Sequence, residues 1–371
     1  MALVHALGLM SGTSMDGIDV AYVATDGESA VEPGPFLAVP YEAAFRRRIE
    51  AGLTDAAAIT MRDERPGNLT ALERAITLRH ADAVRAFLDG AGRDLPKPDI
   101  VGFHGQTVLH RPERGLTVQL GDGALLARET GIPVVFDMRA NDMAHGGQGA
   151  PLVPAFHAAL ARGFGPDRFP VAFVNIGGIS NITFIDRAGD PVAFDSGPGN
   201  ALIDQWVQAR AGIAYDAGGR IASEGGIDEA VAAAYLDKPF FARPGPKSLD
   251  RNDFTLAEAQ TLGLHDGART LAAVSARAIL KAAAILPAAP KMWIVCGGGR
   301  RNDAIMADLR AGGRETGGEA ILAEDAGFDG DAMEAEAWAY LAVRSLKGFA
   351  LTFPTTTGCR EAVSGGVLAR P

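Results

Sequence analysis

The sequence is poor in cysteine, in aromatic residues and in clustered positive charge. Cys296 and Cys359 are the only cysteines among 371 residues, which excludes a disulfide scaffold and a four-cysteine zinc site. Aromatic residues make up 7%, which disfavours the stacking platforms that bind single-stranded nucleic acid. The longest basic run is three arginines at 46–48 and the net charge is −10. We therefore expect no nucleic-acid or membrane partner, because both carry negative charge.

Long apolar runs are also absent. No segment approaches the ~20 uninterrupted apolar residues of a membrane span. Residues 1–10 are apolar but short, and they lack the positively charged start of a signal peptide. We therefore expect a cytoplasmic protein whose first β-strand occupies residues 2–10. The content of 47% hydrophobic and 22% charged residues is that of a folded globular chain, and at ~100–200 residues per domain the length suggests two domains.

The same order of elements occurs twice along the chain. Strand-like segments 2–10 and 18–25 flank a small polar connection, and segments 171–175 and 181–186 flank a Gly-Gly turn. Two strand–turn–strand units, each followed by helices, predict an α/β protein with duplicated halves and a cleft between them. The patterns further predict strands at 100–103, 117–120, 133–136, 192–194 and 293–296, helices at 72–89, 151–161, 200–211, 270–286 and 331–346, and loops at 32–40 and 238–252.

Three glycine-rich turns follow predicted strands. The first runs from Gly12 to Asp19 and reads Gly-Thr-Ser-Met-Asp-Gly-Ile-Asp. Backbone N–H groups and hydroxyls in such a turn can bind phosphate oxygens, and Asp16 or Asp19 could hold Mg²⁺. A plain β-hairpin also explains this segment, and on this segment alone it is the favoured interpretation. It is not a Walker A loop, because no Gly-Lys-Ser/Thr follows the glycines.

The second turn contains Gly177 and Gly178 and again lies between two strands. A plain hairpin would explain this turn as well. However, the presence of such a hairpin in each half favours a two-sided site in which both hairpins bind the phosphates of one ligand, more than either hairpin does alone. The third, Gly297, Gly298 and Gly299, follows the predicted strand 293–296. Glycines at a strand-to-helix junction allow close approach of a nucleotide, or simply tight packing of the helix on its sheet.

Asp195 ends a predicted strand and precedes a Gly-Pro-Gly turn. A carboxylate at this place could act as a general base on water or on a sugar hydroxyl. Alternatively, Asp195 accepts N–H bonds from the turn that follows it.

A further polar segment contains Arg139, Asp142 and the loop Gly147-Gln148-Gly149. An arginine here suits recognition of a ligand that carries a carboxylate, although an Arg–Asp pair within a loop is the simpler interpretation. His104 and His110 lie six residues apart with no third ligand nearby, so we predict no metal site there.

Glu334 and Glu336 lie on the last predicted helix. Residues two apart on a helix point in different directions, and the apolar neighbours of Glu334 indicate that it is the more buried of the two. A carboxylate buried in that way is costly unless it binds something; the simpler alternative is that Glu334 is partly exposed. Glu336, Lys247 and Arg301 receive no role.

Six motifs occur in a recognisable order along nearly the whole chain: Gly8-Leu9-Met10-Ser11-Gly12-Thr13-Ser14-Met15-Asp16-Gly17; His104-Gly105-Gln106-Thr107; Asp137-Met138-Arg139 with Gly146-Gly147-Gln148-Gly149-Ala150-Pro151-Leu152; Asn175-Ile176-Gly177-Gly178; Asp195-Ser196-Gly197-Pro198-Gly199-Asn200; and Cys296-Gly297-Gly298-Gly299. Together they resemble the anhydro-N-acetylmuramic acid kinases of bacteria.

The resemblance implies a two-domain actin-like ATPase (ribonuclease H-like) fold with an interdomain cleft. One lobe would comprise residues 1–168 and 335–371, with the first phosphate loop and the sugar-binding segments. Residues 169–334 would form the other lobe, with the second phosphate loop and the catalytic aspartate. The family hydrolyses the 1,6-anhydro bridge of 1,6-anhydro-N-acetylmuramic acid and phosphorylates its 6-hydroxyl with ATP and Mg²⁺, during recycling of the bacterial cell wall. A homodimer is also implied.

The resemblance also assigns roles to individual residues. Asp195 would be the base that activates water. ATP would contact Gly12, Thr13, Ser14, Met15, Asp16, Gly17, Ile18, Asp19, Gly177, Gly178, Gly297, Gly298 and Gly299. The sugar would contact His104, Arg139, Asp142, Gly147, Gln148, Gly149, Asp195 and Glu334. Two other functions remain open: a kinase for another anhydrosugar such as levoglucosan, and a non-catalytic sugar sensor that binds ATP.

Overall fold

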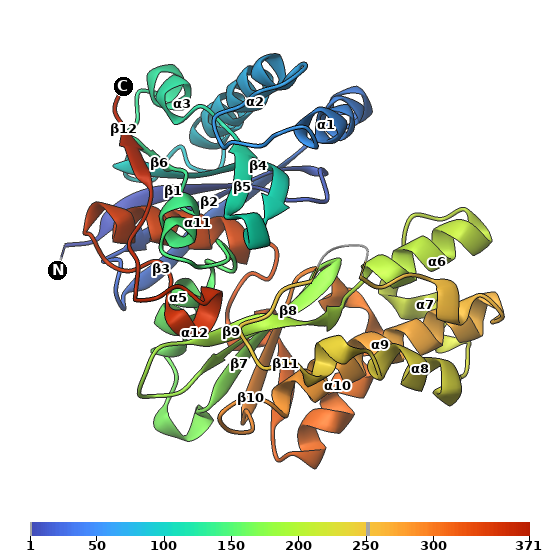
Figure 1. Ribbon diagram of the computed structural model, residues 1–371. Coiled ribbons are helices and arrows are strands. Elements are labelled where there is room, and N and C mark those ends of the chain that lie inside the picture. Colours follow the sequence, from blue (N-terminus) through green and yellow to red (C-terminus); the bar gives the residue numbers. More distant parts are fainter. Residues whose placement is uncertain (1, 250–252) are drawn as a thin grey trace. The chain divides into compact units, whose positions relative to one another are not determined.

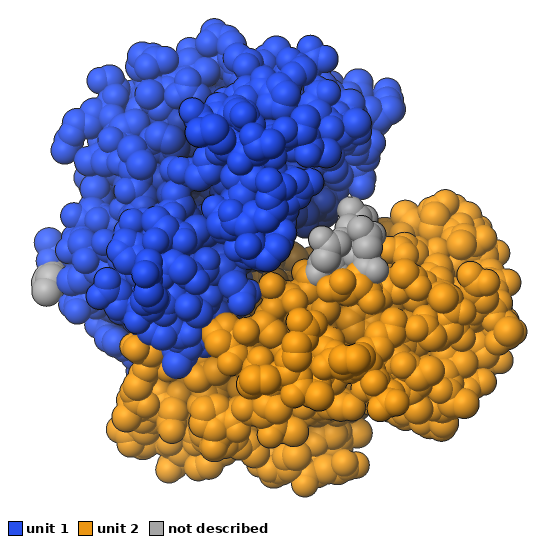
Figure 2. All heavy atoms as spheres, in the orientation of Figure 1, with its two compact units in different colours: residues 1–163, 332–371 blue, residues 164–331 orange. Residues whose placement is uncertain are grey.

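The computed structural model describes residues 2–249 and 253–371 (Figure 1). The chain divides into two compact units (Figure 2). Unit 1 comprises residues 1–163 and 332–371, and unit 2 comprises residues 164–331. The sequence prediction set the divisions after residues 168 and 334, a few residues further along the chain. The roles predicted for the two lobes, and the cleft between them, stay predictions.

Unit 1 is built on a seven-stranded sheet with the order β12-β6-β4-β1-β2-β3, and β5 pairs with β4. Strands β1, β2 and β3 are antiparallel neighbours, whereas β1, β4 and β6 run parallel. The strands are β1 (Val4–Ser11), β2 (Gly17–Thr25), β3 (Val31–Pro40), β4 (Ile100–Arg111), β5 (Leu116–Leu120), β6 (Val134–Phe136) and β12 (Val367–Ala369).

Helices pack on unit 1's sheet because its central strands alternate large and small side chains. Leu7 and Leu9 of β1 share one hydrophobic cluster with α2. Gly8, between them, faces α11, and a Cβ there would lie 1.7 Å from a carbonyl oxygen of that helix. Glycine is therefore required where α11 crosses the strand. The helices are α1 (Ala43–Ala56), α2 (Leu69–Asp89), α3 (Gly123–Thr130), α4 (Ala140–Ala144), α5 (Pro154–Ala161), α11 (Met333–Leu346) and α12 (Pro354–Thr357).

Unit 2 repeats this topology. Its five strands have the order β11-β10-β7-β8-β9, in which β7, β8 and β9 are antiparallel and β7, β10 and β11 are parallel. The strands are β7 (Val171–Ile176), β8 (Ile179–Ile185), β9 (Val192–Pro198), β10 (Met292–Cys296) and β11 (Glu319–Leu322), and the helices are α6 (Ala201–Ala211), α7 (Arg220–Ser223), α8 (Glu229–Leu236), α9 (Leu264–Ala283) and α10 (Asp303–Glu315). Helix α9 packs against β8 and β9.

Most predicted elements are present, with ends shifted by a few residues, but the loop expected at 32–40 is wrong. That segment is β3, and it contains Pro33 and Pro35. Proline is tolerated there because β3 is the last strand of its sheet, so one edge needs no ladder hydrogen bonds. Residues 239–242 of the predicted loop 238–252 form a 3₁₀ turn, and residues 250–252 lie outside the described residues. None of the helices described is both long enough and apolar enough to cross a bilayer.

Candidate active site

The first glycine-rich turn connects β1 to β2 in unit 1. Met15 and Ile18 point into the core, whereas Thr13, Ser14 and Asp16 are exposed. The Ser14 hydroxyl donates to the Asp16 carboxylate at 2.8 Å. The segment is thus a β-hairpin, as one interpretation expected, and its tip presents backbone groups, hydroxyls and a carboxylate. Met15 and Ile18 can reach a phosphate only through their backbone.

A buried hydrogen-bond network supports this turn from below. The Ser11 hydroxyl donates to Gln106 Oε1 at 2.7 Å, and Gln106 Nε2 donates to the Gly12 carbonyl oxygen at 2.9 Å. The Tyr41 hydroxyl lies 3.0 Å from the Ser11 hydroxyl. Because Gln106 is fully buried, this network fixes the end of β1 from which the turn departs.

Arg139 and His104 form a second polar cluster in unit 1. Arg139 donates to the Gly149 carbonyl at 2.7 Å and contacts His104 Nε2 at 3.0 Å. His104 Nδ1 lies 3.2 Å from the Ser11 carbonyl oxygen. Burial, with Arg139 adding to it, lowers the pKa of His104 to about 3. The imidazole is therefore neutral, and these partners select the tautomer that donates from Nδ1 and accepts at Nε2.

Arg139 stays charged at neutral pH. Burial lowers the pKa of its guanidinium to about 10, and the charges of Glu334 and Asp142 oppose this decrease. Trp338 lies against both members of the cluster, 4.7 Å from the His104 ring and 5.5 Å from the Arg139 guanidinium carbon.

Asp142 organises the loop that contains Gly147 and Gly149. One carboxylate oxygen accepts the Gly149 N–H at 2.6 Å, and the other accepts the Thr357 hydroxyl at 2.6 Å. A Cβ at Gly147 would lie 2.2 Å from this carboxylate. The Gln148 N–H donates to the Thr357 carbonyl at 2.8 Å. Asp142 is only 1% exposed, and these hydrogen bonds hold the loop against α4 and α12.

The expected order of burial on α11 is wrong. Glu336 is the buried carboxylate, only 2% exposed, and Glu334 is half-buried. The prediction assumed one apolar face, but every residue from Ala335 to Val343 is buried. Glu334 lies in the first turn of the helix and acts electrostatically on Arg139, which places it beside the Arg139–His104 cluster.

Unit 2 brings three of the predicted motifs together. A Cβ at Gly297 would lie 2.1 Å from Asn175 Oδ1, and one at Gly299 would lie 2.6 Å from Asn200 Oδ1. The Gly177 carbonyl accepts the Asn200 N–H at 2.7 Å. These turns meet because the parallel strands β7 and β10 end at the same edge of the sheet. Gly297 has φ +74°, a backbone conformation that favours glycine.

Arg300, directly after these glycines, is 5% exposed. It donates to the Gly297 carbonyl at 3.1 Å and forms ion pairs with Glu324 at 2.6 Å and Asp331 at 3.0 Å. Arg301 also pairs with Asp331. The third glycine turn is therefore fixed by ionic contacts as well as by packing.

Asp195 lies within β9 and not, as predicted, just beyond a strand that ends at residue 194. The pairing of β9 with β8 changes register here, so that Asn181 faces Asp195 while Ser180 faces Gly197. Such a bulge redirects a side chain. The Asp195 carboxylate accepts the Leu249 N–H at 2.8 Å. This donor comes from a distant segment, and not from the following turn that the simpler interpretation named.

The surroundings of Asp195 favour its neutral form. Part of the side chain remains accessible, but burial raises the pKa of Asp195 to about 7, opposed by the hydrogen bond from Leu249. A carboxylate whose pKa lies near the working pH has the proton affinity of an effective general base.

The chain offers oxygen donors for a magnesium ion at the first hairpin. Among the described residues, no group of three or more His, Cys, Asp or Glu side chains could hold a metal. Asp16 is nevertheless exposed beside Thr13 and Ser14, and Mg²⁺ is commonly bound by one or two carboxylates together with substrate phosphates. This donor set therefore fits a magnesium ion that arrives with a nucleotide.

Sequence reasoning missed the residues that support these motifs. The sequence places Gln106 within the motif His104-Gly105-Gln106-Thr107 but predicts no role for it, and it predicts none for Tyr41 or Trp338. Lys247 received no role, yet its carbonyl accepts the Asp195 N–H at 2.9 Å. These contacts join residues far apart in the chain, so no local spacing indicates them.

The strand order β6-β4-β1-β2-β3 of unit 1 recurs in unit 2 as β11-β10-β7-β8-β9, and in each unit a glycine-rich hairpin follows the first strand. This duplicated arrangement is the actin-like ATPase (ribonuclease H-like) fold that the sequence predicted. Among solved structures, a ROK family glucokinase from Streptomyces griseus in complex with glucose and AMPPNP matches with a TM-score of 0.41 and 17% identity, over 91% of this chain and 99% of that chain. The activator of the 2-hydroxyisocaproyl-CoA dehydratase from Clostridium difficile matches with a TM-score of 0.46 and 10% identity, over 93% and 96%.

Residues 4–370 match the family model of anhydro-N-acetylmuramic acid kinase. Curated relatives of that name include one from Rhizobium etli, 58% identical over 99% of this chain and 98% of the relative. Another, from Brucella canis, is 58% identical over 100% and 99%. The chain therefore belongs to the anhydro-N-acetylmuramic acid kinase family. The predicted function is confirmed at this level: an ATP-dependent kinase of 1,6-anhydro-N-acetylmuramic acid in cell-wall recycling.

Proposed function

We propose that Asp195 is the catalytic base of this kinase and that a single carboxylate serves both bond cleavage and phosphoryl transfer. Water attacks the anomeric carbon and its proton passes to Asp195. The bond from the anomeric carbon to the bridging oxygen breaks, and that oxygen takes the γ-phosphoryl group of ATP. The products are N-acetylmuramic acid 6-phosphate and ADP. The observation that carries this proposal is a carboxylate with a pKa raised to about 7 at the bulge of β9.

We propose that the three glycine-rich turns bind ATP. The phosphates would contact the hairpin 12–19, through backbone N–H groups and the hydroxyls of Thr13 and Ser14, and also Gly177 and Gly178. Gly297, Gly298 and Gly299 would lie against the nucleoside. Support comes from the packing of the second and third turns on each other in unit 2.

Mg²⁺ is the proposed metal cofactor, held by Asp16 or Asp19 together with the phosphates. When bound, it would neutralise charge on the phosphoryl group during transfer.

The sugar would be recognised by unit 1 through His104, Arg139, the loop 147–149 and Glu334. The charged guanidinium of Arg139 suits the lactyl carboxylate of the substrate. The neutral His104 would orient this guanidinium by accepting a hydrogen bond from it at Nε2. Both carboxylate oxygens of Asp142 bond within the protein. We therefore propose that Asp142 positions the loop 147–149 for the sugar. A homodimer and a cytoplasmic location stay proposals drawn from the sequence resemblance.

The substrate can be tested by following ADP release with ATP, Mg²⁺ and one sugar at a time. We expect rapid turnover with 1,6-anhydro-N-acetylmuramic acid and little with levoglucosan, which lacks the lactyl carboxylate. Equal turnover of both sugars would contradict the role of Arg139 and favour a broader anhydrosugar kinase. ATP binding without ADP release with either sugar would instead indicate a sensor.

A further inference from the structure

The segment 245–249 contacts Asp195 twice, although it lies some fifty residues away in the chain. The Asp195 N–H donates to the Lys247 carbonyl at 2.9 Å. Two residues further on, the Leu249 N–H donates to the Asp195 carboxylate at 2.8 Å. The segment also lies tightly along β9, since a Cβ at Gly245 would meet the Phe194 ring at 2.6 Å. One short segment thus holds both the backbone and the carboxylate of Asp195.

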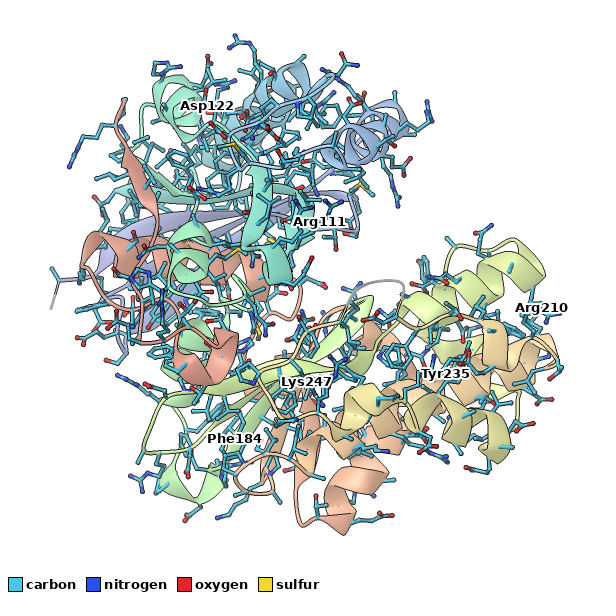
Figure 3. All side chains as sticks on the ribbon, viewed as in Figure 1. Arg111, Asp122, Phe184, Arg210, Tyr235 and Lys247 are labelled. Carbon is cyan, nitrogen blue, oxygen red and sulfur yellow. The ribbon has the colours of Figure 1, made fainter. Side chains whose placement is uncertain are left out.

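The side chain of Lys247 anchors this segment (Lys247 is labelled in Figure 3). Lys247 is 6% exposed, and a buried ammonium group is costly unless its donors are satisfied. Its Nζ donates to the carbonyl oxygens of Phe240 and Arg243 at 3.2 and 3.1 Å. It also lies 4.4 Å from the Phe240 ring and 5.5 Å from the Phe194 ring, within range of cation–π attraction.

We propose that Lys247 is a positioning residue for the kinase reaction: its buried ammonium fixes the segment 245–249, whose Leu249 N–H then sets the orientation of the Asp195 carboxylate. This inference rests on the proposed role of Asp195 as the base. Holding Oδ2 also fixes the direction of Oδ1, the oxygen that would take the proton from water. A misplacement of about 1 Å at such a group costs on the order of 100-fold in rate.

The test compares Lys247→Met with a matched control, Lys238→Met. Met keeps most of the apolar stem and removes the donors. Lys238 is half-buried, and like Lys247 its ammonium lies near aromatic rings: it is 5.0 Å from the Phe254 ring, which lies 6.4 Å from the Phe240 ring. It pairs with Glu258 at 3.0 Å, and no contact that the structure gives for it involves Asp195.

For Lys247→Met we expect kcat to fall about 10- to 100-fold and the KM for ATP to stay within about twofold, because the glycine turns are untouched. Lys238→Met should lower thermal stability and keep the wild-type kcat. An unchanged kcat in Lys247→Met, or an equal fall in both variants, would overturn the inference.

A second pair of variants serves if Lys247→Met does not fold. Leu249→Pro removes the N–H that donates to Asp195, whereas Leu249→Ala keeps it. A fall in kcat for the proline variant beyond that of the alanine variant supports the inference, and equal kcat values refute it.

The variant Asp195→Asn distinguishes failure of the positioning role from failure of the proposed base. If Asp195→Asn is inactive while Lys247→Met has full activity, only the positioning role fails. If Asp195→Asn is active, the proposed base fails and the positioning role fails with it.

Discussion

Replacing Asp195 with Asn should make the stability of the protein depend less on pH. Burial raises the pKa of Asp195 from the ordinary 3.8 to about 7. The folded state therefore binds a proton here more tightly than the unfolded state does. This tighter proton binding adds to the free energy of unfolding: its contribution is complete below pH 3.8 and is lost as the pH rises towards 7. At 1.36 kcal/mol per pKa unit, this difference corresponds to about 4 kcal/mol over the whole range, of which about 3 kcal/mol falls between pH 5 and pH 8.

Asn is isosteric and can still accept the Leu249 N–H, but it does not titrate. The free energy of unfolding of Asp195→Asn, relative to wild type, should therefore increase by about 3 kcal/mol from pH 5 to pH 8. Urea unfolding at several pH values measures this difference directly. Asp190→Asn, at an exposed position in the loop between β8 and β9, is the matched control for removing one carboxylate at the surface. A difference between Asp195→Asn and wild type that stays constant from pH 5 to pH 8 would refute the claim that burial penalises this carboxylate.

Three further predictions follow from the site. The plot of kcat/KM against pH should rise with a midpoint near pH 7, because Asp195 acts as a base only when it is deprotonated. A rise with a midpoint near pH 4 would contradict the raised pKa of Asp195. Asp142→Ala should cost about 3–5 kcal/mol in urea unfolding, since two buried donors lose their acceptor, whereas Asp142→Asn should cost much less, and equal costs would refute the organising role. Gly297→Ala should weaken ATP binding measured by calorimetry, because the new Cβ would lie 2.1 Å from Asn175 Oδ1 and the backbone conformation there favours glycine. Gly317→Ala is the control for backbone strain, because Gly317 also has a positive φ but a Cβ there would have no atom within 4 Å.

The features that could be predicted from the sequence are those with a local signal. The glycine hairpin at 12–17 and the end of α2 at Gly90 are recognisable from a few neighbouring residues. The strand β3 was missed because its prolines argue against a strand unless its edge position is known. The burial of Glu336 was missed because α11 is enclosed on almost every side, so that its position on the helix does not indicate its exposure.

The support around the candidate base lay beyond sequence reasoning for a different reason. The hydrogen bond between Leu249 and Asp195 joins residues 54 positions apart. It depends on the bulge in β9 and on the path of a segment that has no regular secondary structure. The motif identified the carboxylate, but only the three-dimensional arrangement gives its hydrogen-bond donor, its burial and the cause of its raised pKa.

Turnover of Asp195→Asn tests the central claim most directly. With 1,6-anhydro-N-acetylmuramic acid, ATP and Mg²⁺, the wild type should release ADP and form the sugar phosphate. The variant should lose this turnover by several orders of magnitude while it binds ATP with an unchanged dissociation constant. ADP release by the variant at the wild-type rate would contradict the account, because the water would then be activated without this carboxylate.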